Sequence, residues 1–239
     1  MSHPVEDISL HTAQGPVACV VHFPETTPAP VIVCCHGLLS SKESCKYIVI
    51  GEEFSRAGFA VLRFDFSGCG KSPASLEKRL LPARLENLRS VLGFVSEQPW
   101  CNGSLGLLGS SLGGYLSLLA AAGDEGLVRG VVCWATPFDL SRIDTAFRES
   151  EEFRALFPEG SELGDPQSLE GAALVKGVLV VHGEQDETVP WEDGVEIYRR
   201  ALEPKRICLI KDGDHRFVDP ECRRLARNLS LEWFREHCS

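Results

Sequence analysis

No stretch of the sequence is long and apolar enough to cross a membrane. Hydrophobic residues make up 44% of the 239 positions and charged residues 24%, and no apolar run approaches the ~18 residues of a spanning helix. The first twenty residues are acidic and polar, whereas a secretory signal needs a basic start and an apolar block of ~7 to 15 residues. We therefore expect a cytoplasmic protein that has no membrane partner.

The sequence also lacks a dense cluster of lysine and arginine. Its formal net charge is −10, and the field of such a surface repels phosphate backbones. We therefore expect no nucleic-acid partner. An acidic surface is also what ordinary solubility requires, so the charge does not select a substrate.

Signatures of metal, disulfide and nucleotide sites are missing as well. The ten cysteines are scattered without a CxxC pair, which predicts reduced thiols and no metal site. Segment 63–72, RFDFSGCGKS, lacks both the GxxxxGK[ST] spacing and G-x-G-x-x-G, so it is interpreted as a structural turn that borders the pocket. We expect no cofactor.

Apolar segments rich in Val, Ile and Leu alternate with segments of helical spacing along the chain. Strands are predicted at 17–23, 31–35, 60–64, 105–108, 128–134, 178–181 and 207–210, and helices at 44–57, 76–97, 112–122, 191–202 and 220–237. This alternation is typical of an α/β fold with a mostly parallel central sheet flanked by helices on both faces. The length fits one domain over residues 1–239.

One segment interrupts this alternation. Residues 137–173 are charged, contain several Pro and Gly residues, and lie between two predicted strands. A connection of this length in a compact domain usually has a functional reason. We predict a short lid insertion over the site at about 137–173, with a solvated surface loop as the alternative.

The strongest chemical signal is the hexapeptide GSSLGG at 109–114, between the strand LGLL and an apolar helix. It matches G-x-S-x-G only when Ser111 is the central residue, because Gly109 and Gly113 then flank it. Those glycines permit the sharp strand-to-helix turn that exposes a nucleophilic serine. We therefore predict that Ser111 is the catalytic nucleophile and that the Leu112 N–H is one oxyanion donor.

A serine hydroxyl needs a base to take its proton at neutral pH. His215 follows the strand ICLI in the segment KDGDHRF, late in the chain, and is the predicted base. His182 lies within or at the end of a strand and is interpreted as a packed residue, and His237 lies at a terminus.

The imidazole in turn needs an acid that fixes its tautomer and stabilises its cation. Asp186 follows a strand in the segment VLVVHGEQDETVP and lies between the serine and the histidine in the chain. It is the predicted acid, with Glu184 and Glu187 as fallback candidates.

The second oxyanion donor should follow an early strand. The segment VIVCCHGLLSS ends a strand at His36 and Gly37, and the Leu38 N–H is the predicted donor. His36 is expected to order this loop by hydrogen bonding. Such preorganised donors are typically worth ~3 to 4 kcal/mol of transition-state stabilisation each.

Together, the segments HGLLSSKES, VLRFDFSGCGKS, LLGSSLGG, VLVVHGEQDETVP and LIKDGDHRF, from about residue 31 to 217, resemble the α/β-hydrolase superfamily. More narrowly, they are similar to the small serine esterases that include cinnamoyl and feruloyl esterases, and to prolyl oligopeptidase-like hydrolases. The resemblance implies a triad of Ser111, Asp186 and His215 with oxyanion donors at Leu38 and Leu112.

The scaffold hosts many acyl-transfer chemistries by changing loops and lid. The leading hypothesis is a carboxylesterase that cleaves small or medium acyl esters through an acyl-enzyme on Ser111. The alternatives are an acyl-aminoacyl or peptide hydrolase and, less favoured, a non-catalytic binding protein. Five aromatic residues could line a small pocket or simply pack: Phe66, Trp134, Phe138, Phe147 and Trp191.

Overall fold

The computed structural model of the protein describes residues 4–73, 78–123, 126–165, 168–170 and 175–238. Within them, eight strands form one sheet in the order β1-β2-β4-β3-β5-β6-β7-β8. Strand β2 pairs antiparallel with β1 and with β4, and the remaining pairings are parallel. The strands are β1 (Val5–Thr12), β2 (Gly15–His22), β3 (Ala29–Cys35), β4 (Ala60–Phe64), β5 (Cys101–Ser110), β6 (Val128–Trp134), β7 (Lys176–Gly183) and β8 (Leu202–Ile210).

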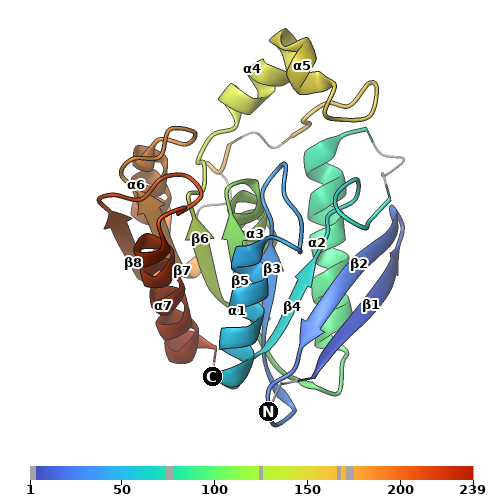
Figure 1. Cartoon of the computed structure of the whole chain (residues 1–239), viewed down its shortest axis with the longest axis vertical. Coiled ribbons are helices and arrows are strands. Elements are labelled where there is room, and N and C mark those ends of the chain that lie inside the picture. The colour runs from blue at the N-terminus through green and yellow to red at the C-terminus, as the bar shows by residue number, and fades with distance from the viewer. Residues whose placement is uncertain (1–3, 74–77, 124–125, 166–167, 171–174, 239) are drawn as a thin grey trace.

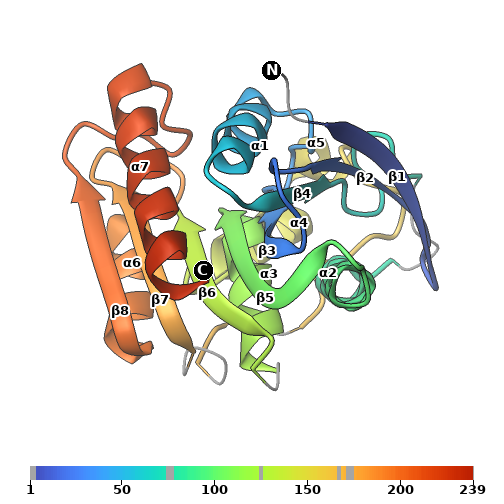
Figure 2. The ribbon, with the colours of Figure 1, turned by 90° about the horizontal axis from the view of Figure 1, so that it is seen from below.

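Helices cover both faces of the sheet, as Figure 2 shows from below. Helices α1 (Cys45–Arg56) and α7 (Pro220–His237) pack on one face. Helices α2 (Leu80–Ser96), α3 (Leu112–Ala122) and α6 (Trp191–Arg200) pack on the other. The predicted α/β class, with a mostly parallel sheet between two helical layers, is confirmed.

Alternation of side chains along the central strands builds a separate core on each face. In β3, Val31, Val33 and Cys35 belong to the core under α2 and α3, whereas Ile32 and Cys34 belong to the core under α1 and α7. Successive side chains of a strand point to opposite faces, so a strand buried on both sides is apolar at every position. That burial explains the uninterrupted apolar runs of the sequence.

The structure differs from the sequence-based expectation in one additional strand, β1, and in the ends of several elements, among them α2. Strand β1 was not predicted: it is an edge strand of mostly exposed and half-buried residues, so its apolar pattern is weak. Helix α2 starts at Leu80 rather than at residue 76, and residues 76 and 77 of the expected helix lie outside the described residues. Of the described helices, none has both the length and the apolarity to span a membrane.

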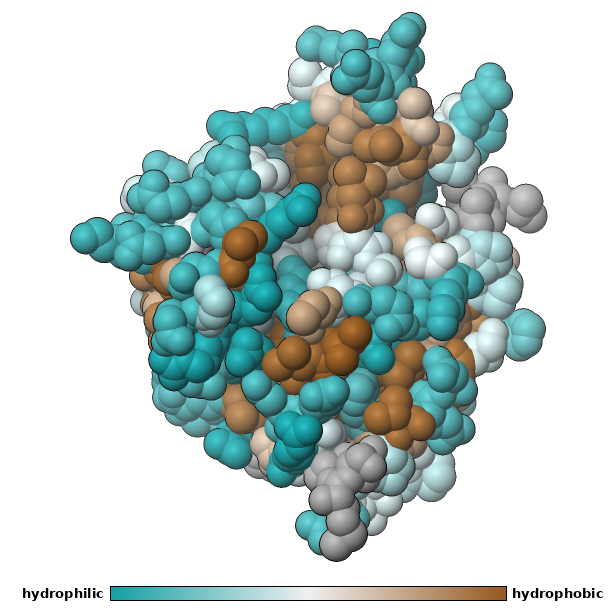
Figure 3. Space-filling model, in the orientation of Figure 1, coloured by the Kyte–Doolittle hydropathy of each residue, from teal (hydrophilic) through white to brown (hydrophobic). Residues whose placement is uncertain are grey.

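The segment between β6 and β7 contains helices α4 (Ser141–Glu149) and α5 (Glu151–Arg154) and lies above the upper edge of the sheet in Figure 1. It docks on the first turn of α2, where the Leu80 and Leu81 N–H groups donate to the carbonyls of Glu162 and Leu163, both over 2.9 Å. Figure 3 shows apolar side chains gathered below it. Residues 166–167 and 171–173 of the predicted insertion lie outside the described residues.

Candidate active site

The turn between β5 and α3 holds Ser111 in a strained backbone conformation. Its φ is 54° and its ψ is −124°, a region that non-glycine residues rarely occupy. The Ser111 N–H donates to the Trp134 carbonyl over 2.8 Å, which ties the turn to β6. A Cβ at Gly109 would overlap the Gly113 backbone, and one at Gly113 would overlap the Cys35 carbonyl. The G-x-S-x-G spacing thus lets α3 start directly against the ends of β3 and β5.

His215 and Asp186 meet across the loops that follow β8 and β7. The Nδ1 of His215 lies 2.8 Å from Oδ2 and 3.0 Å from Oδ1 of Asp186. The carboxylate is fully buried, and the His215 side chain is 13% exposed. The two loops are joined by backbone bonds, including one of 2.9 Å from the Gln185 N–H to the Gly213 carbonyl. Because a carboxylate only accepts, Nδ1 carries the proton and Nε2 has its lone pair free.

Three further groups contact the Asp186 carboxylate. The N–H groups of Thr188 and Val189 donate to Oδ1 over 2.9 and 2.8 Å, and His182 Nε2 lies 3.2 Å from Oδ2 and 3.1 Å from the Val189 carbonyl. Burial raises the pKa of Asp186, but hydrogen bonds from His182, His215 and Val189 outweigh burial and hold this pKa well below its usual range.

His182 is therefore packed in the core, as expected, and also contacts the acid, which the sequence did not indicate. A histidine four residues before the predicted acid is the only local signal for this contact. The fallback acids Glu184 and Glu187 are both exposed.

The buried His36 ring orders the loop that carries Leu38. Its Nδ1 lies 2.7 Å from the Gly37 carbonyl, and its Nε2 accepts a 3.0 Å hydrogen bond from the Phe66 N–H. These partners require a neutral ring with the proton on Nδ1. Burial, reinforced by the charge of Arg84, lowers the pKa of His36 to about 4. Because a trans peptide points its N–H opposite to its carbonyl, fixing the Gly37 carbonyl also fixes the direction of the Leu38 N–H.

The same loop is anchored at two more points. A Cβ at Gly37 would lie 3.5 Å from the Ser111 Cβ, so the loop passes close to the strained serine. Farther along, the buried Lys42 donates from its backbone N–H and from Nζ to the Asp65 carboxylate, over 2.7 and 2.9 Å. This pair gives Asp65 a structural role, consistent with interpreting segment 63–72 as a turn.

Behind the strained turn lies a residue that sequence reasoning missed. Lys46, on α1, donates from Nζ to the Ser110 Oγ over 2.7 Å. Burial, together with the charges of Arg223 and Arg216, lowers the pKa of Lys46 to about 8. No motif marks this lysine, since it is 64 positions from its partner.

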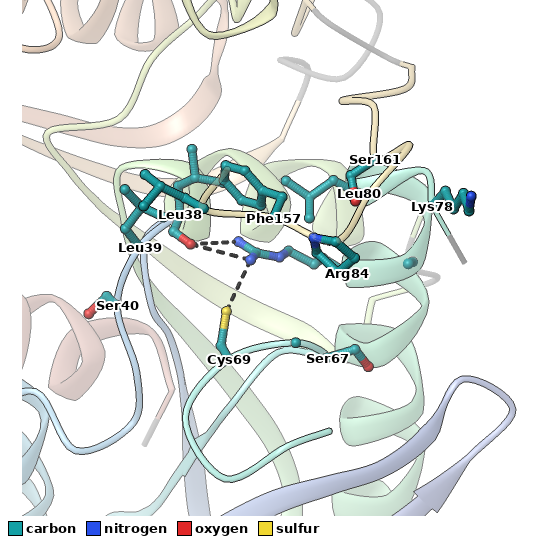
Figure 4. Close-up of a pocket in the computed structure, with 14 residues that line it drawn as sticks. Leu38, Leu39, Ser40, Ser67, Cys69, Lys78, Leu80, Arg84, Phe157 and Ser161 are labelled. Atoms are coloured by element: carbon teal, nitrogen blue, oxygen red, sulfur yellow. Dashed lines mark hydrogen bonds between the residues drawn. The ribbon is translucent and has the colours of Figure 1, made fainter. Parts of the chain in front are cut away.

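The predicted site residues thus gather where β3, β5, β7 and β8 end, the edge at which α/β sheets bind ligands. Leu112 is the first residue of α3, directly after Ser111. Among the hydrogen bonds of the described residues, none joins the Ser111 hydroxyl to His215. A cavity of about 290 Å³ adjoins Leu38 (Figure 4).

The aromatic residues proposed for the pocket do not line this cavity. Phe66 and Trp134 are fully buried in the two cores, and Trp191 is 36% exposed. The aromatic residue of the cavity wall is Phe157, from the segment between β6 and β7. Because Phe157 is far from the other site residues in the sequence, no local pattern indicated its contribution to the cavity wall.

The fold and the placement of the candidate site residues identify the class of protein to which the chain belongs. A profile of the alpha/beta hydrolase fold matches residues 30–163, more than half of the chain, so the chain belongs to the alpha/beta hydrolase fold family. The resemblance inferred from the motifs is confirmed.

Among curated proteins, the mouse palmitoyl-protein thioesterase ABHD10, mitochondrial, is 28% identical over 213 residues, which cover 80% of this chain and 70% of that protein. The uncharacterized protein YfhR of Escherichia coli O157:H7 is 30% identical over 164 residues, 66% of this chain and 53% of that protein.

Two solved structures extend the comparison over nearly the whole chain. The structure of mouse alpha/beta hydrolase domain-containing protein 10 has a TM-score of 0.76 at 25% identity and covers 97% of this chain and 99% of its own. Est1E from Butyrivibrio proteoclasticus, solved with ferulic acid, has a TM-score of 0.76 at 19% identity, with coverages of 95% and 99%. At that identity, the second likeness shows the fold alone. The relative named as a thioesterase, together with the family match, supports a hydrolase.

Proposed function

We propose that the protein is a serine hydrolase that cleaves small or medium acyl esters, or the corresponding thioesters, through an acyl-enzyme on Ser111. The observation that carries the proposal is the His215–Asp186 pair, 2.8 Å apart, at the same sheet edge as a serine held at φ 54°. A strained serine turn or a buried ion pair alone would have a structural explanation. Their combination at one edge supports nucleophilic catalysis.

In the proposed reaction, Ser111 Oγ attacks the substrate carbonyl carbon while its proton passes to Nε2 of His215. The tetrahedral intermediate then collapses, the bond to the alcohol or thiol breaks, and Nε2 returns the proton to the leaving group. Water, deprotonated by the same nitrogen, attacks the acyl-enzyme; the bond between Ser111 Oγ and the acyl group then breaks, Oγ takes the proton back from Nε2, and the acid is released. Asp186 keeps the Nδ1 proton in place and stabilises the imidazolium.

The proposed oxyanion donors are the N–H groups of Leu38 and Leu112. Leu112 begins α3, where the helix dipole favours negative charge. The Leu38 N–H takes its direction from the His36 bond to the Gly37 carbonyl, of 2.7 Å. Neither donor needs to move when charge develops, which is the condition for strong electrostatic stabilisation.

The size of the substrate is inferred from the cavity beside Leu38. Its volume of about 290 Å³ is at the lower end of ligand pockets, which favours a short or medium acyl group. Leu156 and Phe157 belong to its wall, and we therefore include in the proposal that the segment at 137–173 acts as a short lid on a single domain. Thioesters are included because curated relatives are named thioesterases.

The test is hydrolysis of p-nitrophenyl esters from acetate to decanoate, a matched thioester and a p-nitroanilide, by the wild type and Ser111→Ala. We expect turnover of esters or thioesters by the wild type and none by Ser111→Ala. Ser96→Ala, at an exposed position on α2, is the matched control and should retain activity. A fluorophosphonate should label Ser111 in the wild type. A folded wild type without turnover or label would favour a non-catalytic binding protein, and preference for the anilide would favour a peptide hydrolase.

We also propose a cytoplasmic location, with no nucleic-acid or membrane partner. The mouse relative is named as mitochondrial. Imaging of the tagged chain in cells of its source organism distinguishes a cytoplasmic from a mitochondrial location. Enrichment with mitochondria would refute the cytoplasmic location and leave the chemistry untouched.

A further inference from the structure

Arg84 is a buried cation whose protein partners supply no negative charge. Its side chain enters from α2 and is 2% exposed. It donates to the Leu38 carbonyl from Nη1 and Nη2, over 3.2 and 3.3 Å, and from Nη2 to the Cys69 sulfur over 3.0 Å. Its Nε is buried without a hydrogen-bond partner. In the described part of the chain, no carboxylate lies within ion-pair distance of it.

The nearest candidates for a counter-ion are neutral or already paired. Burial raises the pKa of the Cys69 thiol, so the thiol remains protonated at neutral pH. The Asp65 carboxylate, four residues before Cys69 in the chain, is 2.9 Å from Lys42 Nζ. A guanidinium removed from water without an opposite charge is costly for a fold to maintain. Such a cost at the edge of a ligand cavity is a reason to expect an anionic ligand.

Arg84 lines the cavity of about 290 Å³ that lies between the Leu38 loop and the segment between β6 and β7 (Figure 4). Apolar residues, including Leu80 and Phe157, form much of its wall, and a second cation, Lys78, lies at its rim. Among the described residues that line it, none is an aspartate or a glutamate. The chain as a whole has a net charge of −10, so the sign of this cavity is opposite to that of the molecule.

We propose that this cavity binds an acyl group that ends in a carboxylate, with Arg84 as its binding residue and Lys78 as a second, exposed cation. The inference rests on the proposed function, because it assigns the substrate class of the Ser111 site. A short apolar chain would contact Leu80 and Phe157, and its terminal carboxylate would pair with the guanidinium. A planar guanidinium matches a carboxylate geometrically. The neighbouring Leu38 loop would hold the scissile carbonyl.

A structural role for Arg84 is the competing explanation, since the Leu38 carbonyl already accepts two of its hydrogen bonds. Loss of these hydrogen bonds would disturb the oxyanion loop and slow the hydrolysis of every substrate alike. Loss of a binding partner for a carboxylate would slow the hydrolysis of anionic substrates only. The ratio of kcat/KM for two matched substrates separates the roles.

The experiment compares the p-nitrophenyl ester of adipic acid, whose far carboxylate is free, with the same ester methylated at that carboxylate. We expect the wild type to prefer the free carboxylate at least about tenfold in kcat/KM, as for a hydrogen bond to a charged group. Arg84→Gln, which keeps an amide donor for Leu38, should abolish this preference, and Arg84→Lys should restore part of it. Lys78→Gln should lower it by about threefold, because an exposed ion pair is worth less.

Folding of each variant is checked by its melting temperature and by fluorophosphonate labelling of Ser111. If Arg84→Gln does not fold, the inference is still tested by the kcat/KM ratio of the two esters in the wild type and by the effect of Lys78→Gln on that ratio. Equal or better turnover of the methylated ester by the wild type would overturn the inference, as would an equal loss on both esters in Arg84→Gln. In both cases the wild type still hydrolyses an ester, whereas failure of the proposed function itself would leave both esters intact and Ser111 unlabelled.

Discussion

Lys46 Nζ donates to Ser110 Oγ over 2.7 Å, so a cation from α1 lies directly behind the residue that precedes Ser111. The Tyr47 hydroxyl, next to Lys46, donates to the Cys35 carbonyl over 2.9 Å. The two bonds join α1 to the ends of β5 and β3, the strands that carry the serine turn and the Leu38 loop. The burial that places Lys46 there also makes its charge unfavourable.

This burial predicts an alkaline rise in stability. The pKa of Lys46 is about 8 in the folded chain, lowered from 10.5 by burial and by the charges of Arg223 and Arg216. Between these two pH values the unfolded chain binds the proton that the folded chain has released, so the free energy of unfolding rises with pH. The rise is at most about 3 kcal/mol and is smaller because the side chain is partly exposed.

The measurement is urea unfolding of the wild type and Lys46→Met from pH 7.5 to 10.5. Their stability difference should shift in favour of the wild type as the pH rises, because Lys46→Met lacks this group. A difference that stays constant with pH would show that Lys46 retains its ordinary pKa.

His36 predicts a loss of stability in acid. Its pKa is lowered to about 4 by burial and by Arg84, whereas an unfolded histidine titrates near 6.5. As the pH falls from 6.5 to 4, His36 binds a proton in the unfolded chain but stays neutral in the folded chain. This difference lowers the free energy of unfolding by on the order of 3 kcal/mol. Denaturant unfolding at pH 7 and 4.5 should show a larger loss for the wild type than for His36→Gln. Equal losses would contradict the neutral ring.

Replacement of Asp186 tests the proposed orienting acid. In Asp186→Asn the amide can donate toward Nδ1, which places the His215 proton on Nε2 and leaves no base for the serine. We expect kcat to fall by a factor on the order of 10⁴ with the melting temperature retained within a few degrees. Glu187→Gln, an exposed acid on the same loop, is the control and should keep full activity. The reverse pattern would move the acid role to Glu187.

The glycines of the serine turn predict a large difference between two matched substitutions. Gly113→Ala places a Cβ onto the Cys35 carbonyl, and overpacking typically costs about 1 to 3 kcal/mol or more. Gly93→Ala, in the interior of α2 with open space around the new Cβ, should be neutral or stabilise by up to about 1 kcal/mol. Thermal unfolding of both variants measures the contrast. Equal melting temperatures would show that α3 does not depend on the contact with β3.

Local patterns were sufficient for much of the architecture. Uninterrupted Val, Ile and Leu runs predict strands buried on both faces, because each face of such a strand meets a helical layer. The GSSLGG segment predicts the turn at Ser111, because only glycine tolerates the close approach of Gly109 and Gly113 to neighbouring backbone. Strand β1 escaped this reasoning because an edge strand with one open face has no strong apolar periodicity.

Contacts between residues far apart in the sequence were decided by the tertiary structure alone. The chain order of Ser111, Asp186 and His215 predicted which residues to examine, but the 2.8 Å approach of His215 to Asp186 depends on the pairing of β7 with β8. Arg84 reaches the Leu38 carbonyl across 46 positions, and the proton position on His36 depends on the Phe66 N–H. Short-range periodicity and turn chemistry are encoded in neighbouring residues, whereas these contacts depend on strand order and helix packing, which bring distant segments together only in the folded chain.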